Sequence, residues 1–140
     1  MKRVLIVLFG AILFGGICAF FVFNNTVKAD KSYDEFIAFQ IGVYSNYDNA
    51  LRIADRNNGI VVLDNDLYRV FVSVLKEEEA ISKMKSYYDG IGLNYYLKEV
   101  MILKDFGTDI EVYEEMIEKS SSDTYNTLNK DILKVYENYI

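Results

Sequence analysis

Four side chains suited to ligand recognition stand in two stretches that have the alternating pattern of β-strands. Gln40 and Tyr44 lie in the first stretch, and Arg69 and Phe71 lie in the second. The amide of Gln40 both donates and accepts hydrogen bonds. The guanidinium of Arg69 matches a carboxylate, and the rings of Tyr44 and Phe71 offer apolar faces for stacking. These residue types predict recognition of a polar ligand by hydrogen bonds and ring contacts.

Each candidate also has a structural interpretation, and the sequence leaves both open. Gln40 could be an exposed strand residue, and Arg69 could form a cross-strand ion pair on an acidic domain. Tyr44 and Phe71 could be covered by helices from the C-terminal part of the chain.

The residue types in the sequence argue against catalysis and against metal binding. The chain has no histidine, and its single cysteine, Cys18, lies in an apolar segment. Residues 64–66 (DND) lack the downstream Gly and Glu of a calcium loop, so we expect a turn there. The three glutamates at 77–79 have no partner carboxylate and favour a helix start. We therefore predict no catalytic residue, no metal site and no cofactor.

The strands that carry the candidates are predicted from period-two alternation. Residues 36–44 and 67–75 form the two stretches. In the first, Gln40, Gly42 and Tyr44 share the face opposite Phe39, Ile41 and Val43. In the second, Leu67, Arg69, Phe71 and Ser73 share the face opposite Tyr68, Val70, Val72 and Val74.

The remaining elements give the order β-α-β-β-α-β. A helix follows the turn and cap signals of residues 45–48 and ends at the left-handed cap signal of residues 57–59. Further strands are predicted at 60–63 and 95–103, and a second helix opens with residues 76–79 and stops at Asp89-Gly90. This order predicts an α+β, ferredoxin-like domain with both helices on one sheet face and the other face open.

Residues 105–140 are predicted to form one or two amphipathic helices, bent or broken near residues 120–122. The spacing of residues 108–111 (TDIE) resembles a capping box. The apolar stripes consist of Ile110, Tyr113, Met116 and Ile117, and of Tyr125, Leu128, Ile132, Leu133, Tyr136 and Ile140. The helices either pack on the domain and on each other, or bind a partner.

Residues 4–23 form an uncharged run of 20, which as a helix covers roughly 30 Å and predicts a transmembrane anchor. Lys2 and Arg3 precede it, so the N-terminus is expected in the cytoplasm and the rest outside the cell membrane. A cleaved signal peptide, with residues 27–29 (VKA) as its site, is the alternative. The predicted parts are a cytoplasmic start and anchor (1–23), a spacer (24–33), a domain (34–104) and a helical extension (105–140).

The charge distribution bears on the possible partners. The whole chain carries a net charge of −6, and the part after the anchor has 13 basic and 21 acidic residues, a net charge of −8. Because affinity for nucleic acids rests largely on neutralising phosphates, we expect no nucleic-acid partner.

Three short stretches resemble the SPOR (sporulation-related repeat) domain family. They are residues 39–46 (FQIGVYSN) with 48–50 (DNA), residues 67–72 (LYRVFV) and residues 78–80 (EEA). The first is similar to the family's opening strand and helix entry, the second to its third strand, and the last to its second helix entry. The resemblance covers residues 36–103, about half of the chain.

The resemblance implies a β-α-β-β-α-β module of the bacterial envelope that binds peptidoglycan glycan strands without catalysis, in cell division or sporulation wall remodelling. By position, the glycan-binding residues would be Gln40, Tyr44, Leu67, Arg69 and Phe71 on the open sheet face. An envelope or divisome protein could be a further partner. The chain departs from the family at Val43, which replaces a frequent Ser, at Leu67, which replaces an aromatic residue, and at Phe71, which replaces a frequent Gly. The departures at Val43 and Leu67 favour the alternative hypothesis, a protein-interaction module that has lost glycan binding.

Overall fold

Residues 32–140 are described in the computed structural model of the chain, and they form one unit with its own core. The predicted anchor and nearly all of the predicted spacer lie outside the described residues. Within residues 32–140, no helix is both long and apolar enough to cross a membrane.

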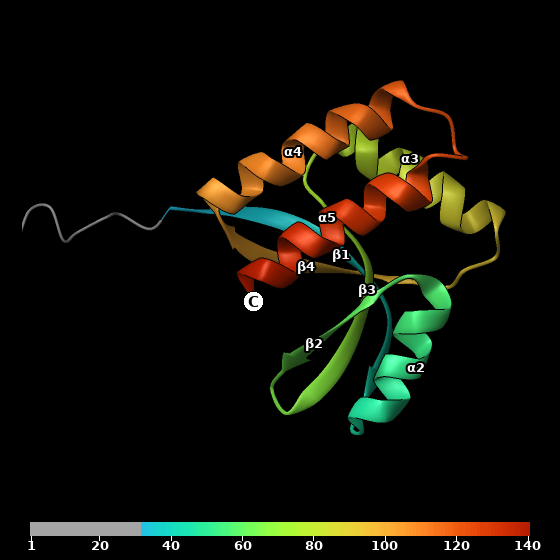
Figure 1. Ribbon diagram of the computed structural model, residues 1–140, viewed down its shortest axis with the longest axis vertical. Helices are drawn as coiled ribbons and strands as arrows, with labels where there is room; N and C mark the ends of the chain where they lie inside the picture. The colour runs from blue at the N-terminus through green and yellow to red at the C-terminus, as the bar shows by residue number, and fades with distance from the viewer. Residues whose placement is uncertain (1–31) are drawn as a thin grey trace, which may run out of the picture. The chain divides into compact units, whose positions relative to one another are not determined.

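The described chain is α+β, as predicted, with four strands and four helices. Their bounds are β1 Tyr33–Tyr44, α2 Tyr47–Asn57, β2 Ile60–Asp64, β3 Leu67–Leu75, α3 Glu78–Gly90, β4 Tyr96–Leu103, α4 Lys104–Lys119 and α5 Tyr125–Tyr139. The strands form one antiparallel sheet in the order β2-β3-β1-β4, which is compatible with a ferredoxin-like arrangement. Figure 1 shows α2 beside β2 at one end of the sheet and the other three helices at the opposite end.

The local signals around α2 and the β2–β3 hairpin fold as predicted. The Oδ1 atom of Asn46 accepts a hydrogen bond from the backbone N–H of Asn49 at 3.1 Å, which caps the start of α2. Asn58 ends the helix in the left-handed conformation (φ 54°). Asn65 and Asp66 both have positive φ (51° and 61°), as a tight two-residue hairpin turn requires.

A β-bulge in β1 changes the predicted faces of that strand. Gln40 pairs with Phe71 and Gly42 pairs with Val70, so Ile41 has no partner across the ladder. Because the extra residue shifts the alternation by one position, Gly42 and Tyr44 turn to the face opposite Gln40. The predicted grouping of Gln40 with Tyr44 on one face is therefore wrong.

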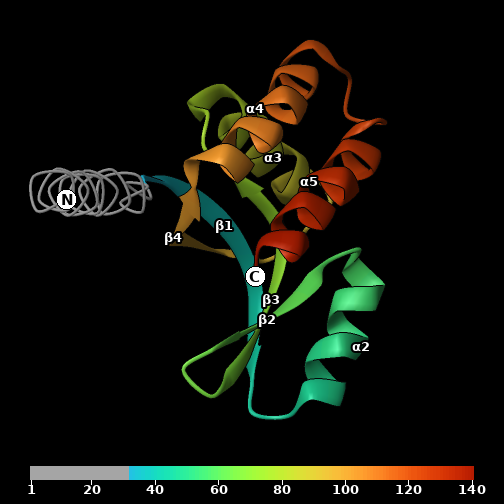
Figure 2. The same cartoon turned by 60° about the vertical axis from the view of Figure 1, so that its left-hand side comes forward.

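The C-terminal extension forms two helices that belong to the same core as the sheet. Ile110 and Ile117 of α4 and Ile132 and Leu133 of α5 are all buried in that core. The extension therefore packs on the domain, which is one of the two interpretations of its stripes. Figure 2 shows α4 and α5 as a helical hairpin beside α3, at the end of the sheet away from α2.

Three details of the extension were predicted wrongly. Helix α4 starts directly after β4 at Lys104, so Thr108 lies inside the helix and its hydroxyl donates to the carbonyl oxygen of Lys104 at 3.1 Å. Met116 and Ile140, both placed in the apolar stripes, are exposed. Glu114, which was not placed in a stripe, is fully buried.

Candidate functional site

Gln40 of β1 and Arg69 of β3 lie together on one face of the sheet, as the alternation predicted. The Nη1 atom of Arg69 donates to the Oε1 atom of Gln40 at 3.0 Å. Gln40 retains only 8% of its exposure because the neighbouring side chains cover it. Its amide oxygen is thus already engaged within the protein, and Gln40 is not the exposed strand residue of the structural interpretation.

The carboxylate of Asp64 forms ion pairs with Arg69 and with Lys98, which lies on the opposite edge strand of the sheet. Asp64, the last residue of β2, accepts from Arg69 Nε at 2.7 Å and lies 3.3 Å from Lys98 Nζ of β4. Strands β2 and β4 are the two outer strands, so this ion pair spans the two strands between them. We call Asp64, Arg69 and Lys98 the cross-sheet cluster. Desolvation opposes ionisation of Asp64, but the hydrogen bonds from Lys98 and Arg69 outweigh it and lower its pKa.

Phe71 does not form an exposed platform, because α5 covers it. Its ring is 1% exposed, and the ring of Tyr136 lies over it with the centroids 6.3 Å apart. Tyr139, one turn later, donates to the carbonyl oxygen of Met101 on β4 at 3.3 Å. The expectation of a fully open sheet face is therefore wrong: α5 covers the end of the face at Phe71, and the end around Arg69 stays uncovered.

Tyr44 and Leu67, the other two predicted residues, lie on opposite faces of the sheet. Tyr44 lies on the α2 side of the sheet and packs with Ala50 and Val70. A side chain at Gly42 would meet the Tyr44 ring at 2.6 Å, so the glycine makes room for that ring. Leu67 lies on the face of Arg69 and is 37% exposed. The structure thus groups Gln40, Leu67 and Arg69 on the uncovered end and separates Tyr44 from them.

Two residues of β4 at this surface were not among the numbered candidates of the sequence reasoning. Tyr96 pairs with Gln40 and Lys98 pairs with Ala38, so both side chains point to the face of Gln40. Tyr96 is 74% exposed, and it is the most exposed aromatic ring of the described chain. Alternation along β4 would have identified the pair, but only after its register against β1 was known.

A groove of about 280 Å³ lies between α5 and the cross-sheet cluster. It is lined by Val62, Leu63, Asp64, Phe71, Lys98, Val100, Met101 and Tyr136. Burial, followed by the neighbouring hydroxyl of Tyr139 and the carboxylate of Asp64, raises the pKa of Tyr136 to about 12. The hydroxyl therefore stays protonated at neutral pH and can donate a hydrogen bond.

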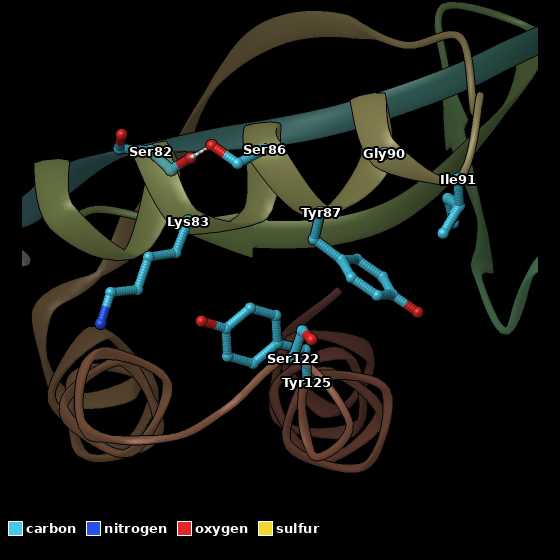
Figure 3. Close-up of a pocket in the computed structure, with 8 residues that line it drawn as sticks. All are labelled: Ser82, Lys83, Ser86, Tyr87, Gly90, Ile91, Ser122 and Tyr125. Carbon is cyan, nitrogen blue, oxygen red and sulfur yellow. Dashed lines mark hydrogen bonds between the residues drawn. The ribbon is translucent and has the colours of Figure 1, made fainter.

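A second groove, of about 460 Å³, lies between α3 and the connection of α4 to α5 (Figure 3). Lys83 and Tyr87 leave α3 on the side of the helical hairpin, and Tyr125 lies between them in the view of Figure 3. The ammonium group of Lys83 donates to the carbonyl oxygen of Glu118 at the end of α4. The rings of Tyr87 and Tyr125 meet edge to face at 5.8 Å. These contacts join α3 to the helical hairpin, and among the described residues lining the groove Lys83 is the one charged side chain.

The chemistry available at the uncovered end is recognition through two cations and an exposed ring, while the amide oxygen of the buried Gln40 holds Arg69. Among residues 32–140, no three carboxylate, histidine or cysteine side chains gather in the manner of a metal site. Comparison of the chain with protein-family models, with curated proteins and with solved structures gave no match.

Proposed function

We propose that this chain is a non-catalytic binding module of a bacterial cell envelope, with a ferredoxin-like domain that binds peptidoglycan glycan strands. The observation that carries the proposal is the grouping of Gln40, Arg69, Tyr96 and Lys98 on the uncovered end of one sheet face. The SPOR-like stretches supply the first and third strands of this surface. The proposed use is the localisation of the protein to sites of wall remodelling in cell division or sporulation.

The residue types at this surface suit a glycan. Sugar rings present apolar C–H faces that pack on aromatic side chains, and Tyr96 offers a ring that is 74% exposed. Hydroxyl and acetamido groups pair with amides and guanidinium groups. Arg69 and Lys98 also suit the carboxylate that muramic acid exposes once its stem peptide is removed.

The anchor positions this surface in the proposal. Residues 4–23 would cross the membrane with the N-terminus in the cytoplasm, and the domain would follow a short spacer. The spacer of ten residues (24–33) reaches at most roughly 35 Å when fully extended. The binding surface would therefore meet wall material close to the membrane.

Co-sedimentation with purified sacculi tests the proposal. A soluble fragment of residues 31–140 contains the whole described unit with its core. We expect the fragment to pellet with amidase-stripped sacculi. The Tyr96→Ala and Arg69→Ala variants should stay in the supernatant. Tyr33→Ala is the matched control, because Tyr33 is an exposed tyrosine of the same sheet that points to the opposite face. Equal loss in Tyr33→Ala would show that the uncovered end is not the binding surface.

A protein-interaction module without glycan binding is the second candidate. It is favoured by the burial of Phe71 under Tyr136 and by the engagement of Arg69 with Asp64 and Gln40. Failure of the fragment to pellet with stripped and intact sacculi, including in a Tyr136→Ala variant that uncovers Phe71, would favour this candidate.

A further inference from the structure

The groove between α5 and the cross-sheet cluster continues the proposed binding surface. Lys98 and Asp64 line the groove and also belong to the cluster that contains Arg69. A ligand that lies over Tyr96 and Arg69 would therefore reach the groove at Lys98. An extended polymer such as a glycan strand would meet both parts in succession.

The apolar side chains that point into the groove come from both outer strands. Val62 pairs with Arg69 and lies on its face, and Val100 of β4 lies on the face of Lys98, whereas Leu63 and Met101 pair with Tyr68 and Glu35 and point to the opposite face. Val100 is partly exposed beside the buried Val62 and Phe71, and it can cover a methyl group or the C–H face of a ring. The phenolic hydroxyl of Tyr136, protonated at neutral pH, adds a polar group to the same wall.

The charge at the groove favours an acidic group. The cross-sheet cluster has two cations and one carboxylate, a net charge of +1, on a chain that is acidic overall. Asp64 is saturated by its partners, because its Oδ2 atom faces Arg69 and Lys98 and its Oδ1 atom accepts from Asn65. About a third of the Lys98 side chain remains exposed, so its ammonium can take a further oxygen.

The size of the groove limits its occupant. Its volume of about 280 Å³ is just below the range of about 300–1,000 Å³ that takes drug-sized ligands. It therefore suits one ring-sized group and not a folded peptide.

We propose that this groove is a subsite for one N-acetylated sugar ring that bears a carboxylate. The apolar part of the sugar would pack against Val100 and the ring of Tyr136, and its carboxylate would pair with Lys98. Helix α5 would then contribute to binding through Tyr136 in addition to covering Phe71. This inference rests on the proposed glycan function and names the part of the glycan that the second half of the surface recognises.

Titration of the ¹⁵N-labelled fragment of residues 31–140 tests the subsite. One ligand is the disaccharide of N-acetylglucosamine and N-acetylmuramic acid with a free lactyl carboxylate, and the other is chitobiose, which lacks the carboxylate. We expect the acidic disaccharide to shift the amide signals of Leu63, Val100 and Met101, and to bind about tenfold more tightly than chitobiose. Lys98→Met should abolish this preference, so that the acidic disaccharide and chitobiose bind with equal affinity. Lys119→Met, at a lysine paired only with Glu115 on the exposed side of α4, is the control.

The outcomes separate the subsite from the proposed function. If the disaccharide shifts the signals of Tyr96 and Gln40 but leaves those of Val100 and Met101 unchanged, the subsite is overturned and glycan binding stands. An undiminished preference for the acidic sugar in Lys98→Met would also overturn it. If neither sugar nor stripped sacculi bind to the fragment, the proposed function fails, and the subsite fails with it.

Discussion

The two β-α-β halves of the sheet are completed in different ways. In the first half, β1-α2-β2, the helix is capped by its own flanking residues, Asn46 and Asn58. Small residues, Ala50 and Ala54, let this helix pack closely on Val70. Helix α3 of the second half, β3-α3-β4, has no capping side chain of its own. The first half thus folds from local signals, and the second depends on the C-terminal helices.

Helix α4 supplies what the start of α3 lacks. The Oε1 atom of Glu114 accepts from the backbone N–H groups of Lys76 and Glu77, at 2.6 and 2.8 Å. Lys76 is tied to the same region by ion pairs with Asp34 and Glu111, which lie 3.0 and 2.7 Å from its Nζ atom. The segment between β3 and α3 is therefore fixed by a helix that follows it by about 30 residues in the sequence.

Helix α5 completes the edge of β3. Strand β2 pairs with β3 only as far as Phe71, so the rest of β3 lacks a partner strand on that side. The carbonyl oxygen of Val72 accepts from the hydroxyl of Tyr88 at 2.9 Å and from the amide of Asn129. Side chains of α3 and α5 thus replace the missing strand, which satisfies a buried backbone acceptor.

The largest expected effect comes from removing residues 105–140. This deletes four buried aliphatic side chains, Ile110, Ile117, Ile132 and Leu133, from the core. At about 1.5–3 kcal/mol each, the loss is comparable to the total stability of a typical domain, about 5–15 kcal/mol. We expect residues 32–104 alone to show no cooperative thermal transition by circular dichroism. A sharp transition with native-like secondary structure would mean that the second half is as independent as the first.

The same contrast explains how much of the fold could be predicted from the sequence. The caps at Asn46 and Asn58, the hairpin turn and the bounds of β3 depend on neighbouring residues, and all were predicted, whereas the grouping of Ser73 with Phe71 on one face was wrong because the register skips Val72. The bulge at Ile41 was not, because it is decided by how β1 pairs with β3. The burial of Glu114 was missed because its partners, the amides of Lys76 and Glu77, lie far away in the sequence.

The residues of the candidate site also differ in whether a local sequence signal could place them. Gln40 and Arg69 were placed together correctly because both sit on predicted strands with clear alternation. Lys98 and Tyr96 required the register of β4, and Tyr136 required the docking of α5, neither of which leaves a local signal. The uncovered end of the face was thus partly predictable, whereas the covered end was not.

Glu114→Ala tests the dependence of α3 on α4. It leaves the N–H groups of Lys76 and Glu77 without an acceptor, and we expect a loss of about 2–4 kcal/mol in the free energy of unfolding. Urea denaturation followed by circular dichroism measures it. Glu114→Gln keeps an acceptor oxygen in place and should lose less than half as much. Equal stability of Glu114→Ala and the unaltered fragment would remove the proposed role of this contact.

Glu114 also predicts a pH dependence. Burial raises the pKa of Glu114 above its ordinary value of 4.5, against the hydrogen bonds from the amides of Glu77 and Lys76, which lower it. The folded state then holds the proton more tightly than the unfolded state does. The contribution of the Glu114 carboxyl to the free energy of unfolding is fully present below pH 4.5 and is lost as the pH rises through the raised pKa. Glu114→Gln should lose this part of the pH dependence, which urea denaturation between pH 4 and pH 8 would reveal.

Two glycines at equivalent helix-to-strand junctions should respond with opposite signs to substitution by alanine. A Cβ atom at Gly59, after α2, would lie 2.6 Å from the carbonyl oxygen of Phe71, whereas at Gly90, the last residue of α3, it would meet no atom within 4 Å. We expect Gly59→Ala to cost about 1–3 kcal/mol, because strand backbone must move. Gly90→Ala should stabilise the protein by up to about 1 kcal/mol through helix propensity. Thermal melts of both variants test this, and a shift of the same sign would show that junction packing does not distinguish the halves.

The smallest expected effect compares the residues at the two helix starts. Asn46→Ala removes the hydrogen bond to the N–H of Asn49 and should cost about 1 kcal/mol. Glu77 occupies the equivalent position before α3, but its side chain makes no capping hydrogen bond, since Glu114 serves that start instead. Glu77→Ala should therefore change the stability by less than about 0.5 kcal/mol. Asn46→Asp, which keeps an acceptor oxygen, should recover most of the loss and so separate capping from other effects of the substitution. If urea denaturation gave equal losses for Asn46→Ala and Glu77→Ala, the second helix would also be capped by its own residue, and its dependence on α4 would be reduced to packing.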